Sequence, residues 1–197
     1  DELRARVSPR TKMLILNSPQ NPTGGVLTET ELGEIAELAR RYGFWVMSDE
    51  VYDALVYDVP FVSIASLGQD ILKLTVIIAA MSKTYAMTGW RVGFLAAPAR
   101  VIENALKAGQ NSITCVAPFV QKAAAFALTD PAIQDVTANM RAAYARRREL
   151  VLRLSHELEC DKVLVTPPQG AFYFFLDFRP LKMTSSEVCE RLLEEAG

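Results

Sequence analysis

Three short apolar runs in this chain are each followed closely by polar residues. The runs span residues 13–16, 44–47 and 74–80. The third run is apolar enough for a β-strand that is buried on both faces of a sheet, as strands of parallel sheets usually are. Because ligands of open α/β sheets bind beyond the carboxyl ends of the strands, one ligand can contact the polar segments after all three runs. The sequence therefore predicts an α/β fold with a ligand site at one edge of the sheet.

Lys83 follows the third apolar run, and Arg91 stands eight residues further along the chain. An ammonium group beside a buried strand is costly to desolvate, so its neutral amine becomes available as a nucleophile. This is the chemistry of a lysine that forms a Schiff base. The alternative is a solvated lysine and a surface arginine, which would be the better interpretation of an isolated pair. The polar segments after the other two runs favour a site.

Three motifs carry a resemblance to a known family. They are Asn-Pro-Thr-Gly at residues 21–24, Ser-Asp-Glu-Val-Tyr at 48–52 and Ser-Lys-Thr-Tyr-Ala-Met-Thr-Gly-Trp-Arg-Val-Gly at 82–93. In this order they resemble the signature of the class I/II aminotransferases, which are fold type I enzymes dependent on pyridoxal 5'-phosphate (PLP). The resemblance is strongest to the aspartate and aromatic aminotransferase-like branch and covers nearly the whole chain. The motif around Lys83 is specific enough to identify the family by itself.

The resemblance also implies a domain organisation. It predicts part of the PLP-dependent transferase large domain, with a mainly parallel sheet flanked by helices, and the start of a small C-terminal α/β domain. We expect the partial large domain at residues 1–130, a long connecting helix at 131–159 and the partial small domain at 160–197. The chain would lack the N-terminal part and the C-terminal end of the family, including the arginine for the substrate α-carboxylate. Such a fragment is expected to expose its sheet edges and to associate.

Four residues are implied to hold the cofactor ring. Lys83 would form a Schiff base with PLP and later move the proton between the substrate Cα and the cofactor C4'. Asp49 would pair with the pyridine nitrogen, because a carboxylate there keeps the ring protonated and able to withdraw charge. Tyr52 and Asn21 would hydrogen-bond the phenolic oxygen and favour its anionic form.

The phosphate of PLP is implied to lie against Arg91 and Ser82. A guanidinium matches the geometry of a phosphate with paired, charge-assisted hydrogen bonds. One position departs from the family pattern, since Ala80 stands where some relatives have a phosphate-binding hydroxyl. This departure weakens the assignment of Ser82.

The function implied by the resemblance is amino-group transfer between an L-amino acid and a 2-oxo acid, in a homodimer. Two alternatives stay open. Another fold type I PLP enzyme, such as a lyase, a decarboxylase or an aminocyclopropane-forming relative, begins with the same lysine chemistry. A non-catalytic PLP-binding regulatory domain attached to a DNA-binding region would keep the lysine and lose turnover.

Composition excludes several other classes. A net charge of −2 with mixed signs gives no reason to expect a nucleic-acid or membrane partner. No apolar run reaches the ~18 to 20 residues of a membrane helix. The three cysteines, Cys115, Cys160 and Cys189, lack metal-ligand spacing, and His156 is the single histidine. These features predict a reduced, cytoplasmic protein without a metal site.

Local signals predict the order of the elements. Thr28 and Glu31 form a capping box for a helix over 29–42, which Gly43 ends. We expect strands at 12–16, 44–47, 74–80, 91–97, 162–166 and 171–178, and helices at 98–108, 116–128, 131–159 and from Thr184 onward.

Several other residues have structural interpretations that compete with functional ones. Tyr57 and Trp90 are expected to pack rather than to contact substrate. The run Arg146–Arg148 is expected to be a solvated helix face. Gly170 and Tyr173 are weak site candidates, because a turn and a core strand explain them equally well.

Overall fold

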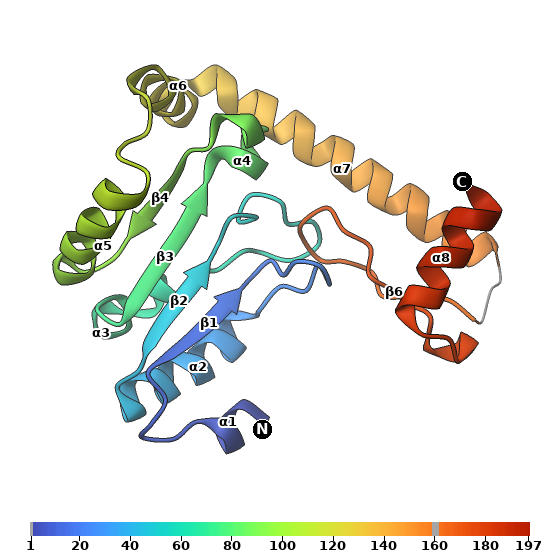
Figure 1. Ribbon diagram of the computed structural model, residues 1–197, viewed down its shortest axis with the longest axis horizontal. Helices are drawn as coiled ribbons and strands as arrows, with labels where there is room; N and C mark the ends of the chain where they lie inside the picture. Colours follow the sequence, from blue (N-terminus) through green and yellow to red (C-terminus); the bar gives the residue numbers. More distant parts are fainter. Residues whose placement is uncertain (1, 159–161) are drawn as a thin grey trace.

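The structure is a computed structural model that describes residues 2–158 and 162–197. A four-stranded sheet in the order β1-β2-β3-β4 lies at its centre (Figure 1). β1, β2 and β3 run parallel, and β4 is antiparallel to β3. Helices flank this sheet, which confirms the predicted α/β class. The four strands are β1 (Met13–Asn17), β2 (Trp45–Asp49), β3 (Thr75–Ala80) and β4 (Gly93–Ala96).

The helices agree with most of the predicted boundaries. The α-helices are α1 (Glu2–Arg6), α2 (Glu29–Tyr42), α3 (Gln69–Leu72), α4 (Met81–Thr84), α5 (Ala99–Ser112), α6 (Pro118–Thr129), α7 (Pro131–Glu157) and α8 (Ser185–Ala196). Three short 3-10 helices are η1 (Ile64–Leu67), η2 (Thr88–Trp90) and η3 (Arg179–Leu181). The predicted end of the long helix at residue 159 lies outside the described residues.

Helix α2 connects β1 to β2 and has both predicted caps. The Thr28 hydroxyl accepts the backbone N–H of Glu31, and the Glu31 carboxylate accepts the backbone N–H of Thr28. Gly43 adopts φ 68°, a left-handed conformation that glycine reaches without a steric penalty, and its N–H donates to Ala39 O. Both ends of the helix were therefore readable from the sequence.

The main core lies between α2 and one face of the sheet. Leu32 and Ala36 of α2 are buried in the same cluster as Leu16 of β1 and Val46 of β2. Strand residues alternate between faces, so Ile15 points to the opposite face, where 68% of it is exposed. A second cluster packs α6 against the segment around α4 and contains Met81, Met87, Val92, Val120 and Ala124.

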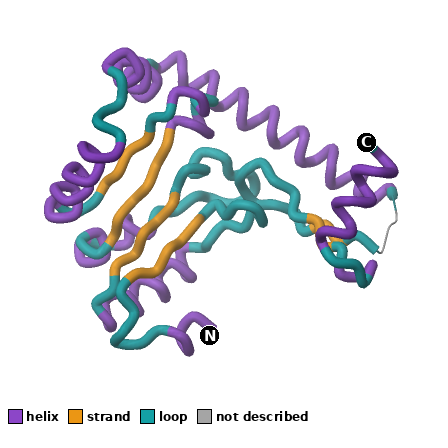
Figure 2. The backbone as a smooth tube through the Cα atoms, viewed as in Figure 1, coloured by secondary structure: helices purple, strands orange, loops and turns teal. Residues whose placement is uncertain are grey.

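Beyond α6, the long helix α7 runs diagonally from the β3–β4 end of the molecule to a small C-terminal unit (Figure 1). This unit contains α8 and an antiparallel pair, β5 (Leu164–Val165) and β6 (Leu176–Asp177). The segment before β6 does not pair with β5. It extends as a loop to the loops at the ends of β1 and β2 (Figure 2).

The predicted strand at 171–178 is wrong over most of its length, since only Leu176–Asp177 is a strand. The reason is that the first residue of this segment forms a backbone hydrogen bond with the loop after β2 instead of with a neighbouring strand. Ala171 donates its N–H to Leu55 O and has φ 58°, which no strand residue adopts. The aromatic alternation of the segment therefore reflects contacts with other loops.

Within the described residues, no helix has the combination of length and apolar character that is needed to cross a bilayer.

Candidate functional site

The ends of β1 and β2 bring the first predicted residues together. Asn17 and Asp49 are the last residues of their strands and are paired in register. The Asn17 side chain donates to Asp49 O at 3.3 Å and accepts the backbone N–H of Asn21 at 2.7 Å. Asn17 thus fixes the loop that carries Asn21. This role of Asn17 was not predicted from the sequence, although an asparagine at the end of a strand was a visible signal.

Tyr52 is the buried centre of this group. Its side chain is 2% exposed, and its hydroxyl is hydrogen-bonded to the hydroxyl of Tyr173. Burial is the largest cause that raises the pKa of Tyr52 well above its ordinary value, and the charge of Asp49 raises it further. Hydrogen bonding to the Asn21 side chain acts in the opposite direction. The structure therefore brings Asn21, Asp49 and Tyr173 within interaction range of the Tyr52 hydroxyl.

Lys83 lies in α4, directly after β3, and faces two aromatic rings. Its Nζ is 5.7 Å from the ring centre of Tyr52 and 5.5 Å from that of Phe172. The two rings meet edge to face, with their centres 5.3 Å apart. The amine thus lies within cation–π range of both rings. Phe172 was not singled out from the sequence, because it belongs to the segment that was expected to be a core strand.

The chain segments that carry Ser82 and Arg91 meet at the same end of the sheet. The N–H of Met81 donates to Val92 O at 3.2 Å, so the chain brings together the neighbours of these two residues. Arg91 adopts φ 52°, and its Nη1 donates to Thr88 O at 3.0 Å. The rest of its guanidinium has further N–H donors, which suit an anion.

Residues 167–173 dock onto the loops that follow β1 and β2. The N–H groups of Gln169 and Gly170 both donate to Gly24 O, at 2.8 and 2.9 Å. A Cβ atom on Gly24, which has φ 71°, would lie 2.4 Å from Pro168 Cβ, and one on Gly170 would lie 2.7 Å from Pro19 Cβ. Such distances leave no room for a side chain. This close backbone approach holds Phe172 and Tyr173 beside Lys83 and Tyr52.

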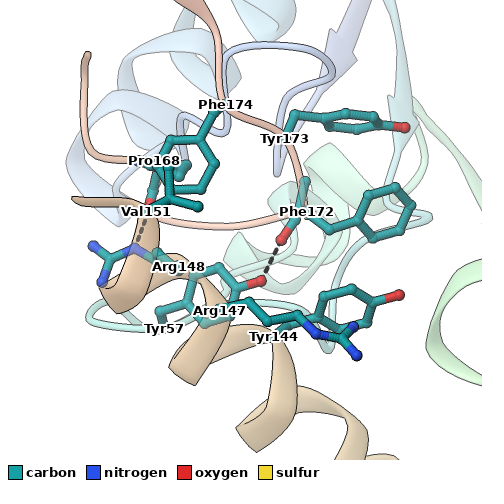
Figure 3. Close-up of a pocket in the computed structure, with 10 residues that line it drawn as sticks. Tyr57, Tyr144, Arg147, Arg148, Val151, Pro168, Phe172, Tyr173 and Phe174 are labelled. Atoms are coloured by element: carbon teal, nitrogen blue, oxygen red, sulfur yellow. Dashed lines mark hydrogen bonds between the residues drawn. The ribbon is translucent and has the colours of Figure 1, made fainter. Parts of the chain in front are cut away.

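Arg148 holds the same segment from the side of α7. It is 8% exposed, its Nε donates to Pro168 O at 2.6 Å, and its guanidinium pairs with Asp58 and Glu149. Figure 3 shows this bond together with the one from the Tyr57 hydroxyl to Ala171 O. The prediction that Arg146–Arg148 is a solvated face is therefore wrong for Arg148.

A cavity of about 200 Å³ lies beside this contact, between α7 and residues 168–174 (Figure 3). Tyr57 lines it and packs against the guanidinium of Arg148, whose Cζ lies 5.4 Å from the ring centre. Tyr57 therefore packs as predicted. The prediction for Trp90 is wrong, because 45% of that residue is exposed.

Comparison with known proteins decides the family. A family model described as aminotransferase class I and II matches residues 1–197. The chain belongs to the class I and II aminotransferases. It is 43% identical over 197 residues to the aromatic-amino-acid aminotransferase 2 of Thermococcus litoralis, and 44% identical over 197 residues to the aspartate aminotransferase of Pyrococcus abyssi.

Both alignments include 100% of this aminotransferase chain and 50% of the relative, so the chain spans about half the length of the curated relatives it matches. The crystal structure of an aromatic aminotransferase from Pyrococcus horikoshii OT3 is similar, with a TM-score of 0.93 at 42% identity. The match covers 99% of this chain and 52% of that one. The likeness extends over the sheet, α7 and the C-terminal unit.

Class I and II aminotransferases depend on PLP, so the site can be tested against that cofactor. PLP presents an aldehyde, a pyridine nitrogen, a phenolic oxygen and a phosphate. These four groups call for an amine, a carboxylate, hydrogen-bond donors and a cation with further donors. The set at the strand ends has this chemistry and consists of Lys83, Asp49, Tyr52, Asn21, Arg91 and Ser82. These residues fit the cofactor.

Proposed function

We propose that this chain carries the PLP-binding lysine of an aminotransferase that moves an amino group between an L-amino acid and a 2-oxo acid. The observation that carries the proposal is the position of the Lys83 amine, which lies 5.7 Å from the ring centre of the buried Tyr52. Tyr52 in turn interacts with Asp49 and Asn21. An amine, an acid and two hydrogen-bonding side chains thus come from three separate strand ends.

Each residue of the set has a distinct task in this proposal. When bound, PLP supplies a ring that withdraws the negative charge left at the substrate Cα after its proton is removed. Lys83 would hold the aldehyde group of PLP through Nζ, and its amine, once free, would move the proton at the substrate Cα. The Asp49 carboxylate would accept the N–H of the protonated pyridine, and the Tyr52 hydroxyl and the Asn21 amide would donate to the phenolic oxygen.

Arg91 and Ser82 bind the phosphate in this proposal. Arg91 contributes charge and paired donors, and Ser82 contributes a hydroxyl from the first turn of α4. Anchoring the phosphate would position the cofactor ring relative to Lys83, because Ser82 precedes the lysine in α4 and Arg91 lies eight residues after it. Orientation of the reacting atoms is a large part of catalysis in any such site.

The names of the relatives favour a transaminase over the other PLP enzymes and over a regulatory domain. The relatives named above are an aromatic-amino-acid and an aspartate aminotransferase. The domain limits at residues 130 and 159, a homodimer and a cytoplasmic location remain predictions that accompany this proposal.

The test is covalent trapping of the cofactor. The chain is incubated with PLP, reduced with borohydride and digested, and the modified peptide is identified by mass spectrometry. We expect an absorbance band of bound PLP before reduction and a single modified lysine, Lys83. Lys83→Ala should abolish the adduct, whereas Lys122→Ala, at an exposed lysine of α6, should leave it unchanged.

An adduct that persists in Lys83→Ala would overturn the assignment of the lysine. Release of 2-oxo acid from an added L-amino acid then tests the reaction itself. Carbon dioxide or ammonia as the product would favour the decarboxylase or lyase alternative.

A further inference from the structure

The hydrogen bond between Tyr52 and Tyr173 joins two parts of the chain that are 121 residues apart. Tyr52 follows β2, and Tyr173 belongs to the docked segment from the C-terminal unit. The two tyrosine rings meet edge to face, with their centres 5.8 Å apart. The ring centre of Phe172 lies 4.8 Å from that of Tyr173. In Figure 3 the Tyr173 hydroxyl points away from Arg148. None of the residue roles assigned above uses this hydroxyl.

Which of the two hydroxyls donates this hydrogen bond decides whether Tyr52 can also donate to the cofactor. A phenol has one proton to donate and can accept hydrogen bonds on its oxygen. If Tyr52 donates to Tyr173, its proton is used within the protein. If Tyr173 donates to Tyr52, the Tyr52 proton stays free for another acceptor. Only the second arrangement is compatible with a Tyr52 that donates to the phenolic oxygen of the cofactor.

We propose that Tyr173 is a positioning residue that acts through Tyr52: its hydroxyl donates to Tyr52 Oη, fixes that phenol and leaves the Tyr52 proton available to the cofactor. The inference rests on the proposed function and extends it to a residue of the C-terminal unit. A phenol that accepts a hydrogen bond is also the better donor, because successive hydrogen bonds polarise one another.

The surroundings hold Tyr173 in place. Backbone bonds tie Gln169, Gly170 and Ala171 to the loops after β1 and β2, and Arg148 bonds to Pro168 O. The segment therefore cannot shift without breaking contacts on both sides. Loss of the Tyr173 hydroxyl alone should leave these contacts intact, because Tyr173→Phe keeps the ring.

The charged and titratable groups that face Tyr52 come from each neighbouring loop. Asp49 lies at the end of β2, Lys83 in α4 and Tyr173 in the docked segment, and the neutral Asn21 follows β1. Burial is the largest cause of the raised pKa of Tyr52. The Tyr52 hydroxyl therefore stays protonated near neutral pH and can act as a donor.

The test is the pH dependence of the absorbance of bound PLP. Stabilisation of an anionic phenolic oxygen lowers the pH at which this absorbance changes. Tyr173→Phe weakens the donation from Tyr52, so we expect the midpoint to move to higher pH by roughly half a unit, the scale of one net hydrogen bond. Tyr144→Phe is the matched control, because Tyr144 stacks on Phe172 through its ring and should leave the midpoint in place.

A double-mutant cycle separates positioning from packing. If Tyr173 acts through Tyr52, the Tyr52→Phe variant and the double variant Tyr52→Phe/Tyr173→Phe should share one midpoint. In urea unfolding without cofactor, the two single changes should also be non-additive. A structural role alone would lower stability in Tyr173→Phe without moving the absorbance midpoint.

Two results would overturn the inference. One is an unchanged midpoint in Tyr173→Phe that still carries PLP on Lys83, which would leave the proposed function intact. The other is a shift that persists when Tyr52 is already phenylalanine. Failure of the unaltered chain to trap PLP would instead overturn the proposed function, and this inference with it.

Discussion

Glu50 is a buried carboxyl group between two residues of the candidate site motif, Asp49 and Val51. It is 7% exposed, and its Oε1 accepts the hydroxyls of Ser48 and Ser63 at 2.9 and 2.7 Å. Burial raises the pKa of Glu50, the two hydroxyl bonds oppose this rise, and the charges of Asp53 and Asp49 add to it. Ionisation of this group therefore works against the folded state.

Replacing this group with a neutral isostere should remove a pH-dependent loss of stability. The raised pKa means that the folded state holds its proton more tightly than the unfolded chain. Stability is then greatest below the ordinary glutamic acid pKa and falls as the pH rises through the raised value. Glu50→Gln keeps an oxygen for both hydroxyls, so its free energy of unfolding should exceed that of the unaltered chain at pH 7 and lose this advantage at pH 4.

Urea unfolding at several pH values measures this difference. Glu37→Gln, at an exposed position of α2, is the matched control and should show a flat difference across the same range. A Glu50→Gln chain that is less stable at pH 7 would contradict the expectation.

The positions of individual residues could be predicted from the sequence where neighbouring strands define the geometry. The ends of parallel strands meet at one edge of a sheet, so Asn21, Asp49 and Lys83 could be placed near each other from their apolar runs alone. Tyr173 could be named only as a weak candidate, because its contact with Tyr52 depends on a docked loop 121 residues away. No local pattern encodes such a contact.

Helix α7 illustrates the same limit for whole elements. Its start was readable, since Asp130 caps it and Pro131 is its first residue. The sequence did not show which arginine of the basic run faces inward, because that depends on where Pro168 and Asp58 lie. The predicted strand at 171–178 failed for a related reason: tertiary hydrogen bonds outweighed the local preference of its aromatic residues for a strand.

Arg148 should make a larger contribution to stability than its neighbours in the basic run. Arg148→Met removes the donor to Pro168 O and leaves that carbonyl without its partner, so we expect a loss of roughly 1–3 kcal/mol in the free energy of unfolding. Arg146→Met makes the same change of charge at an exposed position and should cost no more than about 0.5 kcal/mol. Equal losses in urea unfolding would show that the Arg148 contacts carry no special weight.

The molecule as a whole exposes apolar surface that a sheet of this kind normally covers. Every residue of β4 is exposed, and Ile15 of β1 and Ile113 after α5 are 68% and 78% exposed. β1 and β4 also form the two edges of the sheet. The chain matches only 50% of the length of the relatives named above. Open sheet edges with apolar faces are templates for association.

We therefore expect the 197-residue chain to associate on its own. Gel filtration should give an apparent mass above the 21.8 kDa of the monomer, rising with concentration. Ile15→Lys places a charge on the open face of the sheet and should shift the profile toward the monomer. Glu37→Lys, at an exposed position of α2 on the other side of the sheet, should not. A single monomer peak at high concentration would contradict this expectation.

The 121-residue separation between Tyr52 and Tyr173 also has a consequence for biosynthesis. A ribosome releases the N-terminal residues first, so the loops with Asn21, Asp49 and Lys83 emerge well before the segment that docks onto them. Until translation passes residue 173, the nascent site stays open to solvent and to small molecules on that side. Docking of residues 167–173 then closes this side.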